Sequence, residues 1–275
     1  MNLVSARHGA APKQSLGQNF LTDARIVERM VDAVRLSGDD VVLEIGGGRG
    51  AVTERLARGA RRLVVVEIDR ALAAGLAARF AGEGGVVVVE ADILDVDARR
   101  LLALGPAERA IAFGNIPYYA SSPILIWLAD RSDLFDRAYL TLQREVAERL
   151  VAAPGTKAYG TISVRLAYSG TARRLFSVAP GAFWPRPKVD SAFVEIVFHR
   201  EPPVAVRDEA LLFRVVRAAF AQRRKTLRNT LALLPEAPAA RLAGIAERSG
   251  IDLSRRGETL SLAEFARLAD AVGEG

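Results

Sequence analysis

The sequence has no cysteine and only two histidines among its 275 residues. Without cysteine, disulfides and thiolate zinc sites are excluded. His8 and His199 lie far apart in unrelated contexts, which argues against a histidine-centred metal site and against a Ser-His-Asp hydrolase. We therefore expect a protein that binds no metal and whose chemistry does not depend on a histidine base.

The sequence also lacks a long apolar run. No stretch approaches the ~18 apolar residues that a membrane-spanning helix needs. Residues 1–21 have no apolar core of the kind found in signal peptides; they are basic and free of acids. We interpret them as a tail that contacts an anion rather than as a transit peptide, and we expect a cytoplasmic protein with no membrane partner.

Positive charge exceeds negative charge. Lysine and arginine total 38 against 32 acidic residues, which gives a net charge of +6 and a pI near 10.0. Nearly all of the positive charge is arginine, which grips phosphates with a planar fork and stacks on bases. This balance suits a polyanionic partner, although a compositional bias of the source genome would explain it equally well.

Short apolar strands alternate with helices through much of the chain. Strands are predicted at 41–45, 62–68, 86–91, 109–114, 137–143, 173–178 and 192–198. Helices are predicted near 23–35, 50–58, 70–80, 97–104, 121–129 and 144–152, and the type of 159–168 stays open. This alternation is typical of an α/β fold with a parallel sheet covered on both faces. The last two strands are expected to add an antiparallel edge.

The pattern changes at residues 200–210, where two consecutive prolines occur. Beyond them only amphipathic helices are predicted, near 208–221, 224–233, 237–248 and 261–272. We therefore expect two domains: a Rossmann-like α/β domain over 1–200 and a small all-helical domain over 201–275.

A glycine-rich loop, E-I-G-G-G-R-G-A (44–51), follows the first sheet strand. Gly46 and Gly48 let the backbone turn sharply and approach a ligand at the start of a helix. Glu67 ends the second strand about 20 residues later, where it can accept hydrogen bonds from ribose hydroxyls. This pattern fits nicotinamide dinucleotides and S-adenosylmethionine alike.

The third strand separates these two cofactor classes. Asp92 follows it directly in E-A-D-I-L, where a carboxylate can accept from the exocyclic amine of an adenine. A dinucleotide enzyme would also need a second phosphate site and a hydride-acceptor pocket, and the sequence offers neither. The glycine loop, Glu67 and Asp92 together favour an S-adenosylmethionine-dependent enzyme.

The fourth strand ends in A-F-G-N-I-P-Y (112–118), an unusual ending for a buried strand. An exocyclic adenine amine is a poor nucleophile because its lone pair is delocalised into the ring. Asn115 can accept a hydrogen bond from this amine, and Pro117 rigidifies the turn so that the Ile116 carbonyl can accept a second. Tyr118 offers a face on which the base can stack. In isolation, the same residues would also suit a turn with a packed tyrosine.

These motifs together resemble the ribosomal RNA adenine dimethyltransferases of the KsgA type. The resemblance covers nearly the whole chain, in the same order as the family. It is carried by K-Q-S-L-G-Q-N-F-L (13–21), E-I-G-G-G-R-G (44–50), V-E-I-D (66–69), E-A-D-I (90–93), N-I-P-Y (115–118), Q-R-E-V-A-E-R-L (143–150), K-A-Y-G-T-I-S-V (157–164), F-W-P-R-P-K-V-D-S (183–191) and F-A-Q-R-R-K-T-L-R-N-T-L (220–231).

The resemblance implies a class I methyltransferase fold and a set of site residues. Cofactor contacts are expected from Gln18, Asn19, Leu21, Gly46, Gly48, Glu67, Ile68, Asp92, Ile93 and Asn115. Phe183 would close on the flipped base opposite Tyr118. Arg217, Arg224 and Arg228, spaced to share one helix face, would hold RNA with Arg223 and Lys225 beside them. Two positions depart from the family pattern: Gly47 replaces the usual proline and Tyr119 the usual asparagine.

The function that the resemblance implies is dimethylation of two adjacent adenines near the 3′ end of small-subunit ribosomal RNA. The expected partner is the immature 30S particle, and the expected role is in ribosome biogenesis, with the protein acting as a monomer. Three alternatives stay open: the sister Erm type that modifies 23S RNA and gives macrolide resistance, a non-catalytic assembly factor on the same scaffold and, more distantly, a nicotinamide enzyme.

Overall fold

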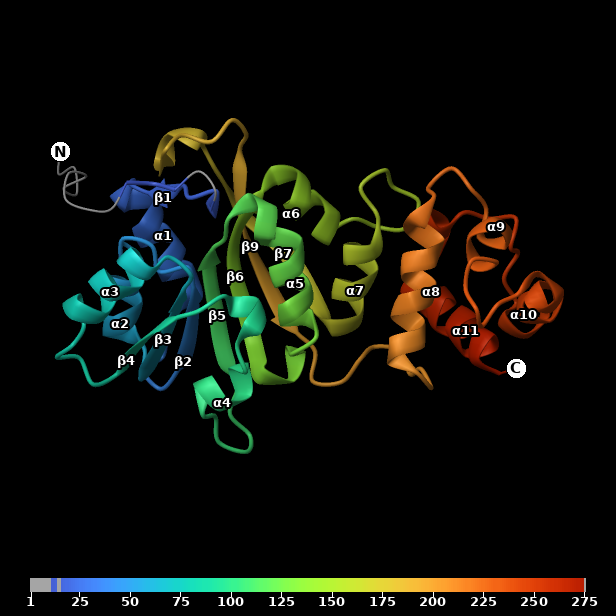
Figure 1. Ribbon diagram of the computed structural model, residues 1–275, viewed down its shortest axis with the longest axis horizontal. Helices are drawn as coiled ribbons and strands as arrows, with labels where there is room; N and C mark the ends of the chain where they lie inside the picture. Colours follow the sequence, from blue (N-terminus) through green and yellow to red (C-terminus); the bar gives the residue numbers. More distant parts are fainter. Residues whose placement is uncertain (1–10, 14–15, 275) are drawn as a thin grey trace. The chain divides into compact units, whose positions relative to one another are not determined.

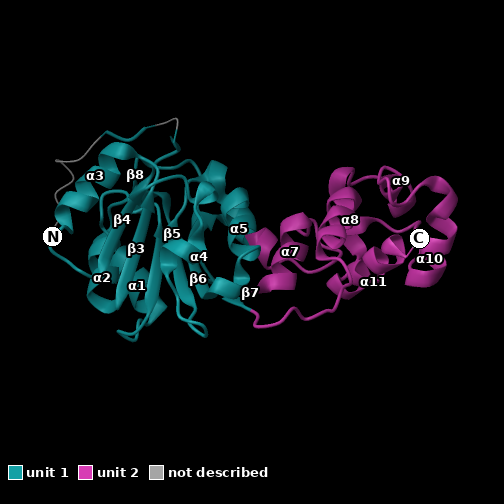
Figure 2. Cartoon of the chain, turned by 60° about the horizontal axis from the view of Figure 1, so that its bottom comes forward, with its two compact units in different colours: residues 1–147, 172–198 teal, residues 148–171, 199–275 magenta. Residues whose placement is uncertain are grey.

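A seven-stranded sheet forms the first of two compact units (Figures 1 and 2). The computed structural model describes residues 11–13 and 16–274; the others, which include His8 and part of the basic tail, lie outside this description. The strand order is β4-β3-β2-β5-β6-β9-β7. The strands are β2 (Val41–Ile45), β3 (Arg62–Glu67), β4 (Val86–Glu90), β5 (Ala110–Asn115), β6 (Phe135–Gln143), β7 (Gly170–Val178) and β9 (Ser191–Phe198).

The central strands run parallel, as the alternation with helices predicts. β2 pairs in parallel with β3 and β5, β3 with β4, and β5 with β6. All five residues of β2 are buried, which is typical of a strand covered on both faces. Because these strands share one direction, the residues that follow β2, β3, β4 and β5 meet at one edge of the sheet.

Helices cover both faces of this sheet (Figure 1). They are α1 (Ala24–Val34), α2 (Thr53–Gly59), α3 (Arg70–Arg79), α4 (Ala98–Leu102) and α5 (Ser121–Ala129), while α6 (Arg144–Leu150) follows β6 and runs from the first unit into the second. In α1, Val27, Met30 and Val34 lie one helical turn apart and pack into a core with sheet residues such as Phe113. The Asp23 side chain starts α1 by accepting from the backbone N–H groups of the first turn.

The late strands β9 and β7 extend the sheet beyond β6, and the antiparallel pairing expected there is present. β9 is antiparallel to β6, but it lies inside the sheet, and β7 forms the edge. The burial of the two strands explains this order. Seven of the eight β9 residues are buried, whereas most of β7, which carries Arg173 and Arg174, is partly or fully exposed. A charged strand suits an edge better than an apolar one.

A second, two-stranded antiparallel sheet joins β1 (Phe20–Leu21) to β8 (Phe183–Trp184). Phe20 lies opposite Trp184, and Leu21 lies opposite Phe183. The sequence does not predict this sheet because two-residue strands carry no measurable periodicity. The pairing brings the N-terminal motif beside the F-W-P-R-P segment, which is more than 160 residues away in the chain.

The second unit is helical and comprises residues 148–171 and 199–275. Its helices are α7 (Thr161–Ser169), α8 (Glu209–Ala221), α9 (Leu227–Leu231), α10 (Leu242–Ser249) and α11 (Leu262–Gly273). The expected boundary at residue 200 differs from this division, because residues 148–171 pack with the later helices. The Tyr168 ring meets Phe213 edge-on, with centroids 5.4 Å apart, and the Tyr159 hydroxyl donates to the Leu260 carbonyl at 2.9 Å.

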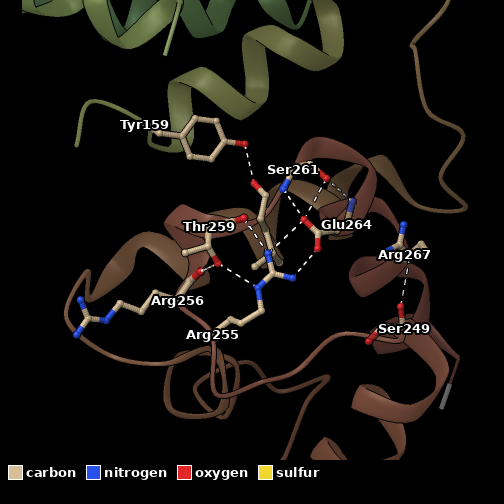
Figure 3. Close-up of polar contacts among 9 residues, drawn as sticks. Tyr159, Ser249, Arg255, Arg256, Thr259, Ser261, Glu264 and Arg267 are labelled. Carbon is tan, nitrogen blue, oxygen red and sulfur yellow. Dashed lines mark hydrogen bonds and ion pairs between the residues drawn. The ribbon is translucent and has the colours of Figure 1, made fainter. Parts of the chain in front are cut away.

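The start of α11 is fixed by a capping box and an ion pair within this unit (Figure 3). Ser261 Oγ accepts from the Glu264 N–H, and Glu264 accepts from the Ser261 N–H at 2.8 Å. Arg255 Nη1 lies 2.5 Å from Glu264 Oε1. This arginine, together with the hydrogen bonds from Ser261, lowers the pKa of Glu264 to about 2.

Candidate active site

A cavity of about 200 Å³ opens at the carboxyl ends of β2, β3, β4 and β5. The N-terminal segment 16–21 and Phe183 line it as well. The cavity brings together every residue that the sequence assigned to the cofactor or to the reaction: Gln18, Asn19, Leu21, Gly46, Gly48, Glu67, Ile68, Asp92, Ile93, Asn115, Ile116, Pro117, Tyr118 and Phe183. The roles of the individual residues remain predictions; their common location is a structural fact.

The glycine loop after β2 has the backbone conformation that requires glycine. Gly46 has φ +78° and Gly48 has φ +55°, both in the left-handed region. The Gly48 N–H donates to Glu67 Oε2 at 2.8 Å, which ties the loop to the end of β3. A Cβ on Gly46 would meet no atom within 4 Å, so the loop leaves open space at this position.

Glu67 and Asp92 present carboxylates from neighbouring strands. Glu67 Oε1 accepts from the Asp69 N–H at 2.9 Å, and burial raises the pKa of Glu67 despite its backbone hydrogen bonds. Each Glu67 oxygen keeps a second lone pair that can accept from a hydroxyl. Asp92 Oδ1 accepts from the Leu94 N–H at 3.0 Å, which holds this carboxylate just beyond β4.

The N-terminal segment is tied across the cavity by a contact that the sequence did not reveal. Lys13 Nζ and Gln18 Nε2 both lie 3.0 Å from Asp69 Oδ2, and Asp69 itself is buried. Burial alone would raise the pKa of Asp69, but these two bonds and the backbone N–H groups of α3 lower it. The only signal was the V-E-I-D motif, whose aspartate received no role. Gln18 thus lines the cavity while its amide anchors the segment.

Asn115, at the end of β5, is oriented by the same segment. Its Nδ2 donates one N–H to the Asn19 carbonyl at 2.9 Å, which fixes the orientation of the amide and leaves Oδ1 able to accept. Beyond the Pro117 turn, the Tyr118 hydroxyl lies 2.7 Å from Ser191 Oγ, and burial raises the pKa of this tyrosine. The ring of Tyr118 is therefore anchored at its hydroxyl end.

Comparisons with known proteins agree with this arrangement. The sequence profile of the ribosomal RNA adenine dimethylase family matches residues 9–268. The chain is 43% identical over 276 residues to ribosomal RNA small subunit methyltransferase A of Pelotomaculum thermopropionicum, covering 98% of this chain and 94% of that protein. The chain belongs to the ribosomal RNA adenine dimethylase family.

Solved structures support the same fold. A dimethyladenosine transferase from Plasmodium falciparum is similar with a TM-score of 0.74 and 23% identity, covering 90% of this chain and 95% of that one. The 23S rRNA methyltransferase ErmE gives a TM-score of 0.65 at 25% identity, covering 93% and 100%. The fold is that of a Rossmann-like methyltransferase, and the predicted fold class is confirmed.

As a member of this family, the protein is a methyltransferase that uses S-adenosylmethionine. The residues of the cavity fit this cofactor. The open space at Gly46 can take an extended ligand close to the backbone, and the carboxylate of Glu67 faces the cavity with lone pairs to spare. Asp92 supplies a further acceptor at the end of the next strand.

Glu44, in the E-I-G-G-G motif, is a cavity residue to which the sequence assigned no role. Its side chain is buried, and its Oε2 has no hydrogen-bond partner among the described residues. Burial raises the pKa of Glu44 to about 8, and the charge of Glu67 acts in the same direction. This carboxyl is therefore protonated at neutral pH, so Glu44 and Glu67 do not form a buried pair of like charges.

The basic residues assigned to RNA do not share one helix face, so this prediction is wrong. Arg217 lies on α8, which ends at Ala221; Arg223, Arg224 and Lys225 lie in the following turn, and Arg228 lies on α9. The Arg223 guanidinium helps to hold the chain in this turn, because its Nη2 donates to the carbonyls of Lys157 and Tyr159 at 2.7 and 2.9 Å. Arg223 is thus engaged with the protein, although it is exposed like the other four residues.

Within residues 11–13 and 16–274, no group of three or more potential metal ligands occurs. No helix in the same residues is long and apolar enough to cross a membrane.

Proposed function

We propose that the protein dimethylates the exocyclic amines of two adjacent adenines in the 3′-terminal hairpin loop of 16S ribosomal RNA, acting as a monomer on the immature 30S particle in the cytoplasm. Membership of the adenine dimethylase family and the small-subunit methyltransferases among its relatives support this substrate. The observation that carries the proposal is the orientation of Asn115, which lines the cavity and whose Nδ2 donates to the Asn19 carbonyl, leaving Oδ1 able to accept.

Cofactor binding is assigned to the glycine loop and the strand-end acids. S-adenosylmethionine, when bound, supplies an electrophilic methyl group attached to a positively charged sulfur. Glu67 would hold the ribose hydroxyls and Asp92 the adenine amine. Asn19 and Leu21, from the segment tied down by Asp69, would contact the methionine part beside Gly46.

The target amine is held by two acceptors. Asn115 Oδ1 and the Ile116 carbonyl would each accept one N–H of the unmethylated amine. This draws the nitrogen toward tetrahedral geometry and frees its lone pair, so no base is needed before transfer. Tyr118 and Phe183 would hold the two faces of the base, which must leave its stack to reach the cavity. The proton released after transfer goes to solvent.

The second transfer needs only part of this arrangement. After the first methylation the amine keeps a single N–H, so one of the two acceptors suffices to hold it. The same cavity can therefore serve both transfers, provided that it accommodates the first methyl group.

RNA is held by exposed positive charge in the helical unit. Arg217, Arg224, Lys225 and Arg228 are assigned to phosphate contacts, because their side chains are exposed. The assignment of Arg223 to RNA is weaker, because its guanidinium already donates to two backbone carbonyls. Through this substrate the protein would take part in ribosome biogenesis.

The test is methyl transfer from labelled S-adenosylmethionine to separated ribosomal particles. We expect label in unmethylated 30S particles, none in 50S particles, and loss of transfer in Asn115→Ala. Label in 23S RNA instead, together with macrolide resistance in a sensitive host, would establish the Erm-type activity. If no particle at any assembly stage is labelled, the protein is not a catalyst of this reaction, and a binding role in assembly would replace it.

A further inference from the structure

Two large aromatic side chains are exposed, one in the lining of the cavity and one that follows a lining residue in the chain. Tyr119, which lines the cavity, has 60% of its surface exposed, and Trp184, which follows the cavity residue Phe183, has 48% exposed. Neither has a role in the proposed cofactor site or amine clamp. Exposed aromatic rings of this size beside a ligand site are typical of binding surfaces.

Trp184 is held in place by its neighbours although its ring is half exposed. It lies directly opposite Phe20 in the β1–β8 pair, so both rings are on the same face. The Arg49 guanidinium carbon lies 4.7 Å from the Phe20 ring centroid and 4.9 Å from that of Trp184. Arg49 belongs to the glycine loop, so this contact fixes the indole next to the cofactor site.

Tyr119 is held by the same N-terminal segment. A Cβ on Gly17 would lie 3.1 Å from Tyr119 Cδ1, so the ring packs closely against the backbone of Gly17. The Tyr119 hydroxyl has no hydrogen-bond partner among the described residues. Both aromatic residues therefore contact the stretch from Gly17 to Phe20, whose Asn19 carbonyl accepts from Asn115.

We propose that Trp184 and Tyr119 form an aromatic rim on which the RNA bases next to the target adenine stack. This inference rests on the proposed function. An adenine that enters the cavity leaves its neighbours without a stacking partner, and an exposed aromatic ring can replace that partner for any base. When one adenine of the adjacent pair is in the cavity, the other is one of these neighbours.

Single-stranded RNA is the occupant that the local charge favours. Arg186 and Lys188 follow Trp184 within four residues, and the Lys188 side chain is exposed. Phosphates that flank a base stacked on Trp184 would meet these cations. The rim adjoins the cavity through Phe20, which lines the cavity and lies opposite Trp184 in the β1–β8 pair.

The test uses the full chain and 30S particles whose 16S RNA carries fluorescent 2-aminopurine on either side of the target adenine. With the product S-adenosylhomocysteine bound, wild-type protein should quench this fluorescence on binding, because stacking quenches 2-aminopurine. Trp184→Ala and Tyr119→Ala should each lose the quenching of one neighbour and weaken binding to the particle about tenfold. Trp184→Phe and Tyr119→Phe, which keep a ring, should retain most of both effects.

Two controls separate stacking from other causes. The affinity for S-adenosylhomocysteine and the Tm of the alanine variants should stay close to wild type, which shows that the cofactor site is intact. The slope of log K against log salt should also stay unchanged, because no phosphate contact is removed. Unchanged quenching and binding in both alanine variants would overturn the rim. If wild-type protein still methylates the adenines in that case, the proposed function stands; if it methylates none, the function fails whatever the fluorescence shows.

Discussion

Asn115 shows how one hydrogen bond can select the role of a side chain. An asparagine amide has a donor end and an acceptor end, and only the acceptor end can hold an amine through its N–H groups. The bond from Nδ2 to the Asn19 carbonyl engages the donor end. The N-terminal segment would therefore contribute to the proposed amine clamp without touching the amine.

Replacing Asn115 by alanine removes one of the two acceptors that we propose for the target amine. We expect kcat for 30S methylation to fall on the order of a hundredfold, because the amine is then poorly oriented for transfer. The KM for the particle should change much less. Asn229→Ala, an exposed asparagine on α9, is the matched control and should keep wild-type kcat. Near-normal kcat in Asn115→Ala would contradict the clamp.

Glu44 links the cavity to the pH dependence of stability. Its pKa is raised from 4.5 to about 8, so the native state keeps a proton that the unfolded chain releases. Stability therefore falls as pH rises through this window. Glu44→Gln, which mimics the neutral acid, should gain Tm relative to wild type progressively between about pH 5 and pH 8. Glu67 is present in both proteins, so its contribution to the pH dependence of Tm largely cancels from the difference between them. A Tm difference that does not vary with pH would show that Glu44 is ionised in the native protein.

At the scale of elements, the strand ends were predictable and the small second sheet was not. The glycine loop, Glu67, Asp92 and Asn115 each follow a strand, and parallel strands place such residues at one edge. The β1–β8 pairing joins two-residue strands that are distant in the chain and have no periodic pattern. Nothing local in the sequence specifies such a pairing.

At residues 223–225 the sequence predicted a feature, a shared helix face, that the structure does not have. Their spacing fits a helix, but α8 ends before them, and Arg223 bonds the carbonyls of Lys157 and Tyr159 from another segment. A tertiary contact of this kind competes with the local helical preference, and the spacing of the basic residues in the sequence does not reveal it. Burial effects such as the raised pKa of Glu44 are hidden for the same reason.

The capping box of α11 gives a prediction at this scale. Ser261→Ala removes the oxygen that accepts from the Glu264 N–H and should lower the free energy of unfolding of the helical unit by about 1 kcal/mol. Ser261→Thr keeps a hydroxyl and should retain most of the stability that the cap contributes. Denaturant unfolding followed by helical circular dichroism is the measurement. Equal losses in the two variants would show that the hydroxyl does not cap the helix.

At the scale of the whole molecule, the net charge of +6 is consistent with an RNA partner, and its distribution can be tested. Arg224→Ala and Arg228→Ala should each weaken binding to 30S particles and lower the salt slope by about 1. Arg223→Ala should instead lower Tm, because it breaks two bonds to backbone carbonyls. If Arg223→Ala lowers the salt slope and leaves Tm unchanged, Arg223 contacts RNA and its bonds to the backbone carbonyls do not stabilise the fold.

We propose that the protein dimethylates two neighbouring adenines of 16S RNA in this cavity. Mass mapping of RNA from 30S particles treated with the enzyme and S-adenosylmethionine tests it most directly. We expect two adjacent adenines in the 3′-terminal hairpin loop, each carrying two methyl groups, and little methylation with Asn115→Ala over the reaction time in which wild type is complete. Methyl groups on 23S RNA, on another base, or on a single isolated adenine would contradict it.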